Sequence, residues 1–149
     1  MKIHDCMTSF SNCVEKMGVV HQLLTRLIIG LVFASTGWGK LHNLQKIIDF
    51  FNSLGIPAAK IQAPFVAGME FLCGVLVLIG LATRYASIPL IIIMLVAIRT
   101  AKWEEVTGVF SLFDMSEFLY MVLLTWLVVY GGGKISVDYL ICKRCRRDK

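Results

Sequence analysis

The sequence predicts an all-α membrane protein, a bundle of four transmembrane helices with an amphipathic helix in its first outer loop. Two observations predict this fold. The 149-residue chain is 57% hydrophobic, with a mean hydropathy of +0.73, which is more apolar than an ordinary soluble domain. Its apolar residues also come in long blocks, and a helix of about 20 such residues can cross a bilayer. Nothing in the pattern indicates strands.

Four apolar blocks are the predicted spans. They cover approximately residues 22–41, 63–82, 85–102 and 117–133. The first and third blocks carry charges near their ends, where long cationic side chains can reach the membrane interface. Because four spans use about half of so short a chain, we expect one membrane domain over residues 1–149 and no separate soluble domain.

The segments outside the spans set the expected orientation. Residues 1–20 lack the apolar stretch and the cleavage site of a signal peptide, so we expect the first span to be retained. An even number of spans places both termini on one side, and that side carries ten of the 15 lysines and arginines. Since positive charge favours the inside, residues 1–20 and the basic tail 134–149 are predicted to be cytoplasmic.

The first outer loop predicts an amphipathic helix within residues 43–55. Its apolar residues recur at helical spacing, namely Leu44, Ile47, Ile48, Phe51 and Leu54. Asn43 and Gly55 are suited to begin and end such a helix. Next to a spanning helix it should lie in the interface plane, either covering the bundle or acting as a lid over a pocket.

The second span contains a single ionisable residue, Glu70, and the first contains Arg26. Both lie on stripes of small residues, which membrane helices use to approach closely. We therefore expect both side chains to face the bundle interior. A charge at mid-helix costs about 2.5–3.5 kcal/mol on insertion, so Glu70 should be neutral, paired or near water. Arg99 and Arg26 are the expected partners.

Two interpretations of the Glu70 position stay open. A buried ion pair would fix the register of the helices. Alternatively, a polar cavity would hold a ligand head group beside a proton-accepting carboxylate.

The cysteines favour reduced thiols. In the predicted topology none of the five faces an oxidising compartment, which argues against disulfides. Cys142 and Cys145 form a CxxC pair among basic residues, which would suit thiol redox chemistry. A zinc site of this pair with Cys6 and Cys13 is a weaker candidate because its spacing is unusual. Exposed or lipidated thiols are the preferred interpretation, and no metal is expected.

Two other functions are disfavoured. The tail beginning at Lys143 has no folded basic surface beside it, so it indicates membrane topology and anionic lipid rather than nucleic acid. Haem would need axial ligands inside the bundle, whereas His4, His21 and His42 lie away from mid-membrane. The lipid bilayer is therefore the predicted partner.

Four segments together resemble the DoxX family of small four-span bacterial membrane proteins. They are RLIIGLVFASTGWGKL (26–41), FFNSLGIPA (50–58), EFLCGVLVLIGLATR (70–84) and GGGKISVD (131–138). The family-type positions are Arg26, Gly37, Lys40, Glu70, Gly74, Gly80, Arg84, Ser136 and Asp138. Many members carry a histidine near the end of the third span, where this chain has Arg99.

The resemblance implies a multi-pass protein of the bacterial inner membrane. It also implies an accessory oxidoreductase subunit that acts with a partner protein, and a quinone is the candidate cofactor. The candidate ligand-binding residues are Arg26, Trp38, Lys40, Glu70 and Arg99, with Glu70 as the candidate proton relay. The alternative is a non-enzymatic scaffold, or a binder or transporter of a lipid-like molecule. A homo-oligomer is a possible assembly in either case.

Overall fold

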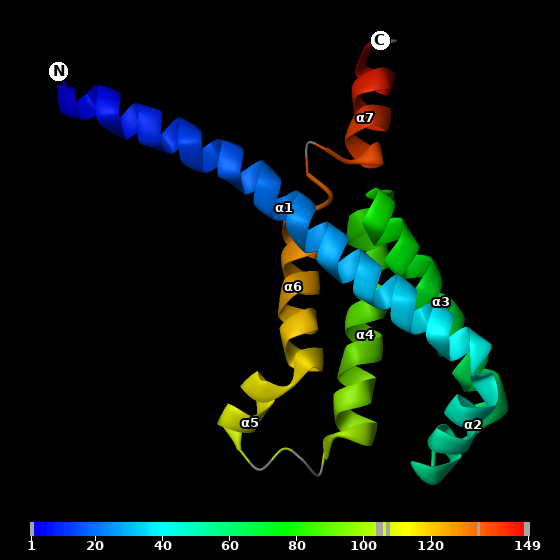
Figure 1. The fold of residues 1–149 in the computed structure, drawn as a ribbon. Helices are drawn as coiled ribbons and strands as arrows, with labels where there is room; N and C mark the ends of the chain where they lie inside the picture. The colour runs from blue at the N-terminus through cyan, green and yellow to red at the C-terminus, as the bar shows by residue number, and fades with distance from the viewer. Residues whose placement is uncertain (1, 104–105, 107, 134, 148–149) are drawn as a thin grey trace.

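The computed structural model describes residues 2–103, 106, 108–133 and 135–147, and the side chains of these residues except 2–17, 109, 142 and 145–147. The described residues form seven helices (Figure 1). In chain order they are α1 (Lys2–His42), α2 (Leu44–Ser53), α3 (Ala59–Ile79), α4 (Thr83–Ala101), α5 (Val109–Asp114), α6 (Ser116–Tyr130) and α7 (Val137–Arg147).

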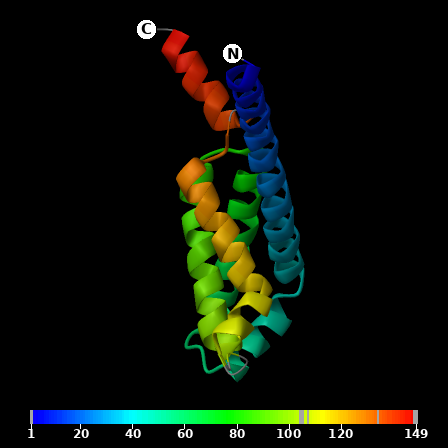
Figure 2. The same ribbon diagram turned by 90° about the vertical axis from the view of Figure 1, so that its left-hand side faces the viewer.

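The bundle is built on two main helix pairs. Helix α1 packs along α3, helix α4 packs along α6, and α3 joins the two pairs through α4. The N-terminal part of α1 and α7 lie at one end of the molecule, here called the α7 end (Figures 1 and 2). Helices α2 and α5 lie at the opposite end. Both chain ends are therefore on the same side of the bundle.

Three helices are long and apolar enough to cross a membrane. They are residues Gly18–His42 of α1, all of α3 and all of α4, while α6 is a shorter apolar helix. Their outward faces remain apolar, as shown by Ile28, Ile92 and Val129, each more than half exposed. A helix that is apolar on its outer face as well as in its core is typical of a lipid environment. The structure is thus that of a helical membrane protein.

Several helix ends differ from the predicted boundaries. Helix α1 begins at Lys2, far before the span predicted from residue 22. Helix α3 ends at Ile79 instead of 82, because Gly80 takes a left-handed conformation (φ 76°) that ends the helix. Helix α6 ends at Tyr130 instead of 133 for a similar reason, since Gly131 has φ 73°. Apolar composition continues past Ile79, so it could not locate the end of α3, whereas the fourth span was predicted to end in the glycine cluster 131–133, next to the observed end.

The amphipathic helix predicted in the first outer loop is confirmed as α2. Leu44, Ile47, Ile48 and Phe51 are partly buried and its polar residues are exposed, and it packs against α3. Phe50, which lies off the apolar stripe, is 48% exposed. Asn43 precedes the helix as expected, but its amide donates to the Gly39 carbonyl oxygen (3.1 Å) and does not cap α2.

Helices α5 and α7 were not predicted. Helix α7 begins after Ser136, whose Oγ accepts a hydrogen bond from the Tyr139 backbone N–H (3.2 Å). A serine before the first turn and an acidic residue, Asp138, within it are the usual signals of a helix start. These signals were present in the sequence but are too short to stand out beside the apolar blocks.

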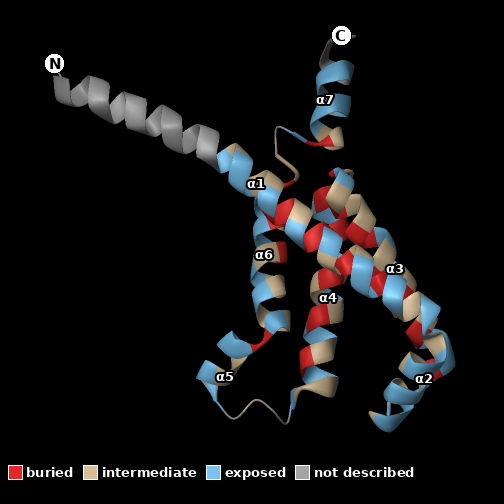
Figure 3. Ribbon diagram, viewed as in Figure 1, coloured by how far each residue is buried: buried red, intermediate tan, exposed pale blue. Residues whose placement is uncertain are grey.

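The core lies where α1, α3, α4 and α6 meet (Figure 3). Its buried residues are Ile29, Phe33, Cys73, Val77, Ala86, Leu90, Met94, Leu124 and Leu127. All four helices contribute, so the shorter helix α6 is as much a part of the bundle as the three long ones.

Candidate functional site

Glycines bring α1 and α3 into close contact. A Cβ atom added to Gly74 of α3 would lie 2.5 Å from the Ala34 backbone nitrogen, and one added to Gly30 of α1 would lie 2.7 Å from the Leu78 backbone. Gly37 meets the Phe71 backbone in the same way. The predicted packing of small-residue stripes is therefore confirmed, and any larger residue would force the backbones apart.

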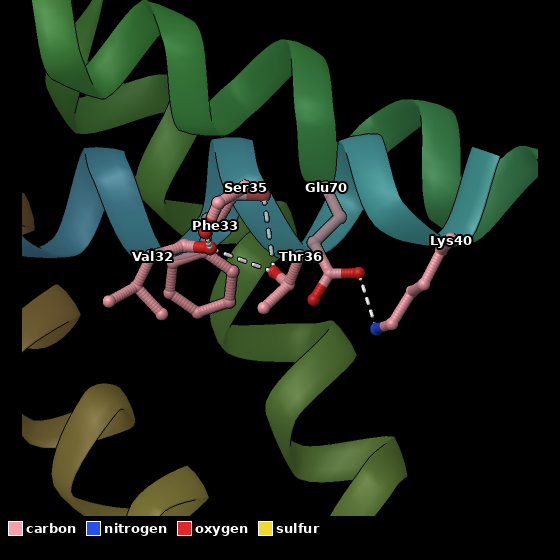
Figure 4. Close-up of polar contacts among 6 residues, drawn as sticks. All are labelled: Val32, Phe33, Ser35, Thr36, Lys40 and Glu70. Carbon is pink, nitrogen blue, oxygen red and sulfur yellow. Dashed lines mark hydrogen bonds and ion pairs between the residues drawn. The ribbon is translucent and has the colours of Figure 1, made fainter. Parts of the chain in front are cut away.

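Glu70 lies inside this α1–α3 seam and forms an ion pair with Lys40. The distance from Lys40 Nζ to Glu70 Oε2 is 2.5 Å. The Glu70 side chain is 3% exposed, whereas that of Lys40 is 34% exposed. Figure 4 shows the two side chains pointing toward one another from α3 and α1. The carboxylate is thus buried and paired, and its cation remains accessible from one side.

The nearby hydroxyl of Thr36 takes no part in this pair. Its Oγ1 donates to the Val32 carbonyl oxygen of its own helix (2.9 Å), as Figure 4 shows. Such a bond within the helix is common for threonine. Lys40 is therefore the partner that the structure gives to Glu70.

The prediction that Arg99 or Arg26 pairs with Glu70 is wrong. Arg99 is exposed at the end of α4, with its guanidinium 4.5 Å from the centre of the Trp103 ring. Arg26 is fourteen positions before Lys40 on α1, which separates them by about 21 Å at 1.5 Å per residue. Helical spacing indicates the face on which a residue lies, but it does not show which cation of another helix lies opposite Glu70.

Arg26 instead holds the segment that leads into α7. It is 4% exposed, and its Nη1 donates to the carbonyl oxygens of Gly132 (2.8 Å) and Ile135 (2.7 Å). The predicted interior location of Arg26 and Glu70 is confirmed. The role of Arg26 in the structure is to fix the backbone between α6 and α7.

Asp138 ties α7 to the turn between α3 and α4. Its carboxylate accepts hydrogen bonds from the backbone N–H groups of Ala82 (2.8 Å) and Thr83 (3.2 Å), and its own N–H donates to the Gly80 carbonyl oxygen (3.1 Å). The first N–H groups of a helix have no acceptor within the helix, and here the Asp138 carboxylate is the acceptor for two of them at the start of α4. We call Arg26, Gly80, Ser136 and Asp138 the α7-end cluster.

Gly80 allows this cluster to close. A Cβ atom there would lie 2.5 Å from Arg26 Nη1 and 2.9 Å from the Ser136 Cβ, and the residue has φ 76°. Both the space and the backbone conformation therefore require glycine. Among the described residues, Arg26 Nε and Thr83 Oγ1 are buried without a hydrogen-bond partner.

The structure divides the family-type positions into two groups. Gly37, Lys40, Glu70 and Gly74 lie in the α1–α3 seam, and Arg26, Gly80, Arg84, Ser136 and Asp138 lie at the α7 end. The sequence indicated that these residues matter, but it did not show that they form two separate sites.

Trp38 lies apart from Lys40. The two are two positions apart on α1, which turns their side chains about 200° from one another. The Trp38 ring is 4.4 Å from that of His42 and 5.4 Å from that of Phe71, centre to centre. The structure thus brings Lys40 and Glu70 together but not Arg26, Trp38 or Arg99, whose binding of a ligand stays a prediction.

Two cavities lie toward the α7 end, away from the Lys40–Glu70 pair. The larger, of about 590 Å³, has polar residues including Gln22, Arg84 and Asp138 in its wall. The smaller, of about 380 Å³, is mostly apolar and lies between α1 and α6. The sequence gave no indication of either one.

The thiol predictions fall outside the described side chains. Those of Cys6, Cys13, Cys142 and Cys145 are not described, so the CxxC and zinc hypotheses stay predictions. Cys73 is a free thiol buried in the core.

Comparisons with known proteins connect this fold to a family. The DoxX family model matches residues 21–103, which include α2, α3, α4 and most of the long apolar part of α1. No solved structure matches the chain.

Three bacterial proteins match over most of their length. "Uncharacterized membrane protein Rv3486" of Mycobacterium tuberculosis is 36% identical, covering 91% of this chain and 90% of that protein. "Putative oxidoreductase CatD" of Bacillus subtilis is 32% identical, covering 87% and 93%. "Inner membrane protein YqjF" of Escherichia coli is 25% identical, covering 88% and 99%.

Proposed function

The chain belongs to the DoxX family, and on this premise we propose that it is an accessory subunit of a quinone-linked redox system in the bacterial inner membrane. In this proposal an apolar ligand with a polar head group, such as a quinone, binds beside Lys40 and Glu70. The name of the Bacillus subtilis relative, "Putative oxidoreductase CatD", supports a redox role.

The observation that carries the proposal is the uneven exposure of the ion pair. Glu70 is buried among apolar helices, while a third of the Lys40 side chain is accessible. Ionisable residues inside membrane segments are costly and usually mark a functional site. A pair needed only for packing could have both members buried, whereas this one offers its cation to a molecule arriving from outside the seam.

The residues present suit a quinone head group. A quinone carbonyl accepts hydrogen bonds, and the Lys40 ammonium has three donor hydrogens, of which Glu70 uses one. Helices α1 and α3 also expose apolar side chains, including Trp38, Phe65 and Leu72, as the ring and tail require. When bound, the quinone would accept electrons from a partner redox protein, and Glu70 would relay protons to the ligand through Lys40.

We further propose that α6 is the fourth span and that both termini are cytoplasmic. Helix α6 has 15 residues and a length of about 22 Å, less than the roughly 30 Å of a bilayer core. It nevertheless packs along α4 and contributes to the core. A fourth crossing agrees with both ends of the chain lying on the same side of the bundle.

The experiment is a thermal shift titration of the purified full-length protein with a short-chain ubiquinone. We expect the ligand to raise the melting temperature of the wild type and of Lys102→Gln. That control removes another ion pair, Lys102–Glu117 (3.0 Å), at the α2 end of the bundle. Glu70→Gln and Lys40→Met should lose the shift. A wild type with no shift, or an equal shift in all four proteins, would overturn the proposal.

The alternative is a non-enzymatic scaffold, or a binder or transporter of a lipid-like molecule. The two cavities at the α7 end favour a binder, because neither includes the Lys40–Glu70 pair. One measurement distinguishes the two functions. It is the rate of electron transfer to quinone in membranes that contain the redox partner. Glu70→Gln should abolish it if the protein is a redox subunit and leave it unchanged if the protein only binds lipid.

A further inference from the structure

The larger cavity at the α7 end presents a positive charge. Arg84 is the cationic side chain among its described lining residues. The carboxylate of Asp138 also lines it, but both oxygens already accept hydrogen bonds from the first turn of α4. At about 590 Å³ the cavity is within the usual range of ligand sites. Because the Asp138 carboxylate is directed at those N–H groups, Arg84 is the charged side chain that can meet a ligand in the cavity, and its guanidinium would attract an anion.

Glycines keep the wall beside Arg84 bare. The wall is formed by residues Gly131–Gly133, and a Cβ atom on Gly131 would lie 3.0 Å from Arg84 Nε. Gly131 has φ 73° and Gly133 has φ 77°, conformations that other residues rarely adopt. The turn that ends α6 thus places backbone, rather than side chains, next to the guanidinium, and leaves room for a ligand.

The apolar cavity adjoins the polar one. Tyr130 lines both, and His21 of the apolar cavity is next to Gln22 of the polar cavity on α1. The apolar groove follows α6 from Tyr130 past Trp126 to Val122. These residues are four and eight positions away from Tyr130, so the groove extends about 12 Å along the helix.

Tyrosines mark the level of the polar cavity in the membrane. Tyr85, Tyr130 and Tyr139 all line it and are 78%, 51% and 45% exposed. Tyrosine is enriched at the interface between the hydrocarbon core and water. The polar cavity is thus at head-group depth, and the groove between α1 and α6 leads from it toward the hydrocarbon core.

We propose that this combined site binds one anionic phospholipid. Its phosphate pairs with Arg84, and one acyl chain lies in the groove along α6, beside Trp126 and Val129. The exposed Lys143 and Arg144 of α7 lie on the short helix just beyond the cavity and attract anionic lipid to this face. The site is distinct from the Lys40–Glu70 pair and does not depend on the proposed redox role.

The test is native mass spectrometry of the delipidated full-length protein in detergent. The protein is incubated with equal amounts of phosphatidylglycerol and phosphatidylcholine that carry the same acyl chains. Both lipids carry the phosphate, but phosphatidylcholine also carries a choline ammonium that the Arg84 guanidinium repels. We therefore expect the wild type to retain the anionic lipid about fivefold over the zwitterionic one, the factor that one exposed charge interaction can supply. Arg84→Gln should bring the ratio close to one.

Three further samples make the test specific. Arg99→Gln removes an exposed arginine at the other end of the same helix and should keep the preference. Val129→Trp fills the groove and should lower the retention of both lipids without changing their ratio. Excess inorganic phosphate should not displace the bound lipid, because it cannot occupy the groove. Melting curves of each variant show that it is folded.

Each contrary result overturns the proposal. If Arg84→Gln keeps the preference and the Lys143→Gln/Arg144→Gln double variant loses it, the attraction is a diffuse effect of the tail. Unchanged retention in Val129→Trp would exclude the groove. Displacement by inorganic phosphate would mean that the cavity binds small anions rather than a lipid.

Discussion

Lys40 and Glu70 join α1 to α3 by an ion pair of 2.5 Å, and only the lysine is accessible. The pair lies in the same seam as Gly37 and Gly74, whose lack of side chains lets the two backbones approach. The buried Glu70 carboxylate therefore relies on the Lys40 ammonium to balance its charge. Removal of that cation would leave a charge buried in an apolar contact.

Lys40→Met is therefore expected to destabilise the protein more than Glu70→Gln. Breaking a buried pair by removing one partner costs about 3–5 kcal/mol, because the other charge stays buried. Glu70→Gln leaves a partly exposed lysine that solvent can reach. The difference is measured as the free energy of unfolding in detergent, followed by circular dichroism.

The double variant Lys40→Met/Glu70→Gln should recover much of the loss. It removes both charges, and replacing a buried pair by uncharged residues is often tolerated. Additive losses in the double variant would show that the two residues do not interact in solution.

Gly74→Ala is expected to destabilise the α1–α3 seam. The added Cβ would lie 2.5 Å from the Ala34 nitrogen, so the helices must separate, at a cost of about 1–3 kcal/mol. Gly37→Ala should act in the same way. The melting temperature in detergent reports both changes.

Two other glycines of the same helices are the controls for this prediction. A Cβ atom on Gly39 of α1 or Gly68 of α3 would meet nothing within 4 Å. Alanine is the better helix former, so Gly39→Ala and Gly68→Ala should leave the stability unchanged or raise it by up to about 1 kcal/mol. Equal losses at all four positions would contradict close packing as the cause.

Arg26→Gln should loosen the connection between α6 and α7. It removes the donor shared by the Gly132 and Ile135 carbonyl oxygens, and loss of each part-buried hydrogen bond should cost about 0.5–1.5 kcal/mol. Faster cutting by trypsin after the exposed Lys143 and Arg144, which lie within α7 and are cut more readily when the helix opens, is the direct measurement. The same rate in Arg26→Gln and in the Arg99→Gln control would argue against this role.

Asp138→Ala should weaken the start of α4. Its carboxylate serves two backbone N–H groups, and loss of a comparable helix cap costs about 0.5–2 kcal/mol. Asp138→Asn keeps one acceptor oxygen and should lose less. Chemical unfolding curves give both values. Asp49→Ala, which removes an exposed carboxylate bonded only to Gln45, is the matched control and should have little effect.

The sequence predicted the bundle but not all of its helix ends. Apolar length identified the helices, and helical spacing identified α2, because both patterns are repeated over many residues. The end of α3 depended instead on the conformation of Gly80, and the start of α7 on the hydroxyl of Ser136. A single glycine or serine is a weak sign of a helix end when the residues before and after it are mostly apolar.

By itself, the sequence determined that the protein lies in a membrane, which faces of α1 and α3 are small, and that Arg26 and Glu70 point inward. Only the tertiary structure decided that Glu70 pairs with Lys40, that Arg26 binds the backbone before α7, and that the Arg84 cavity lies beside an apolar groove. The physical reason is that periodicity fixes the face on which a residue lies, whereas a partner depends on how two helices cross and on the direction of each side chain.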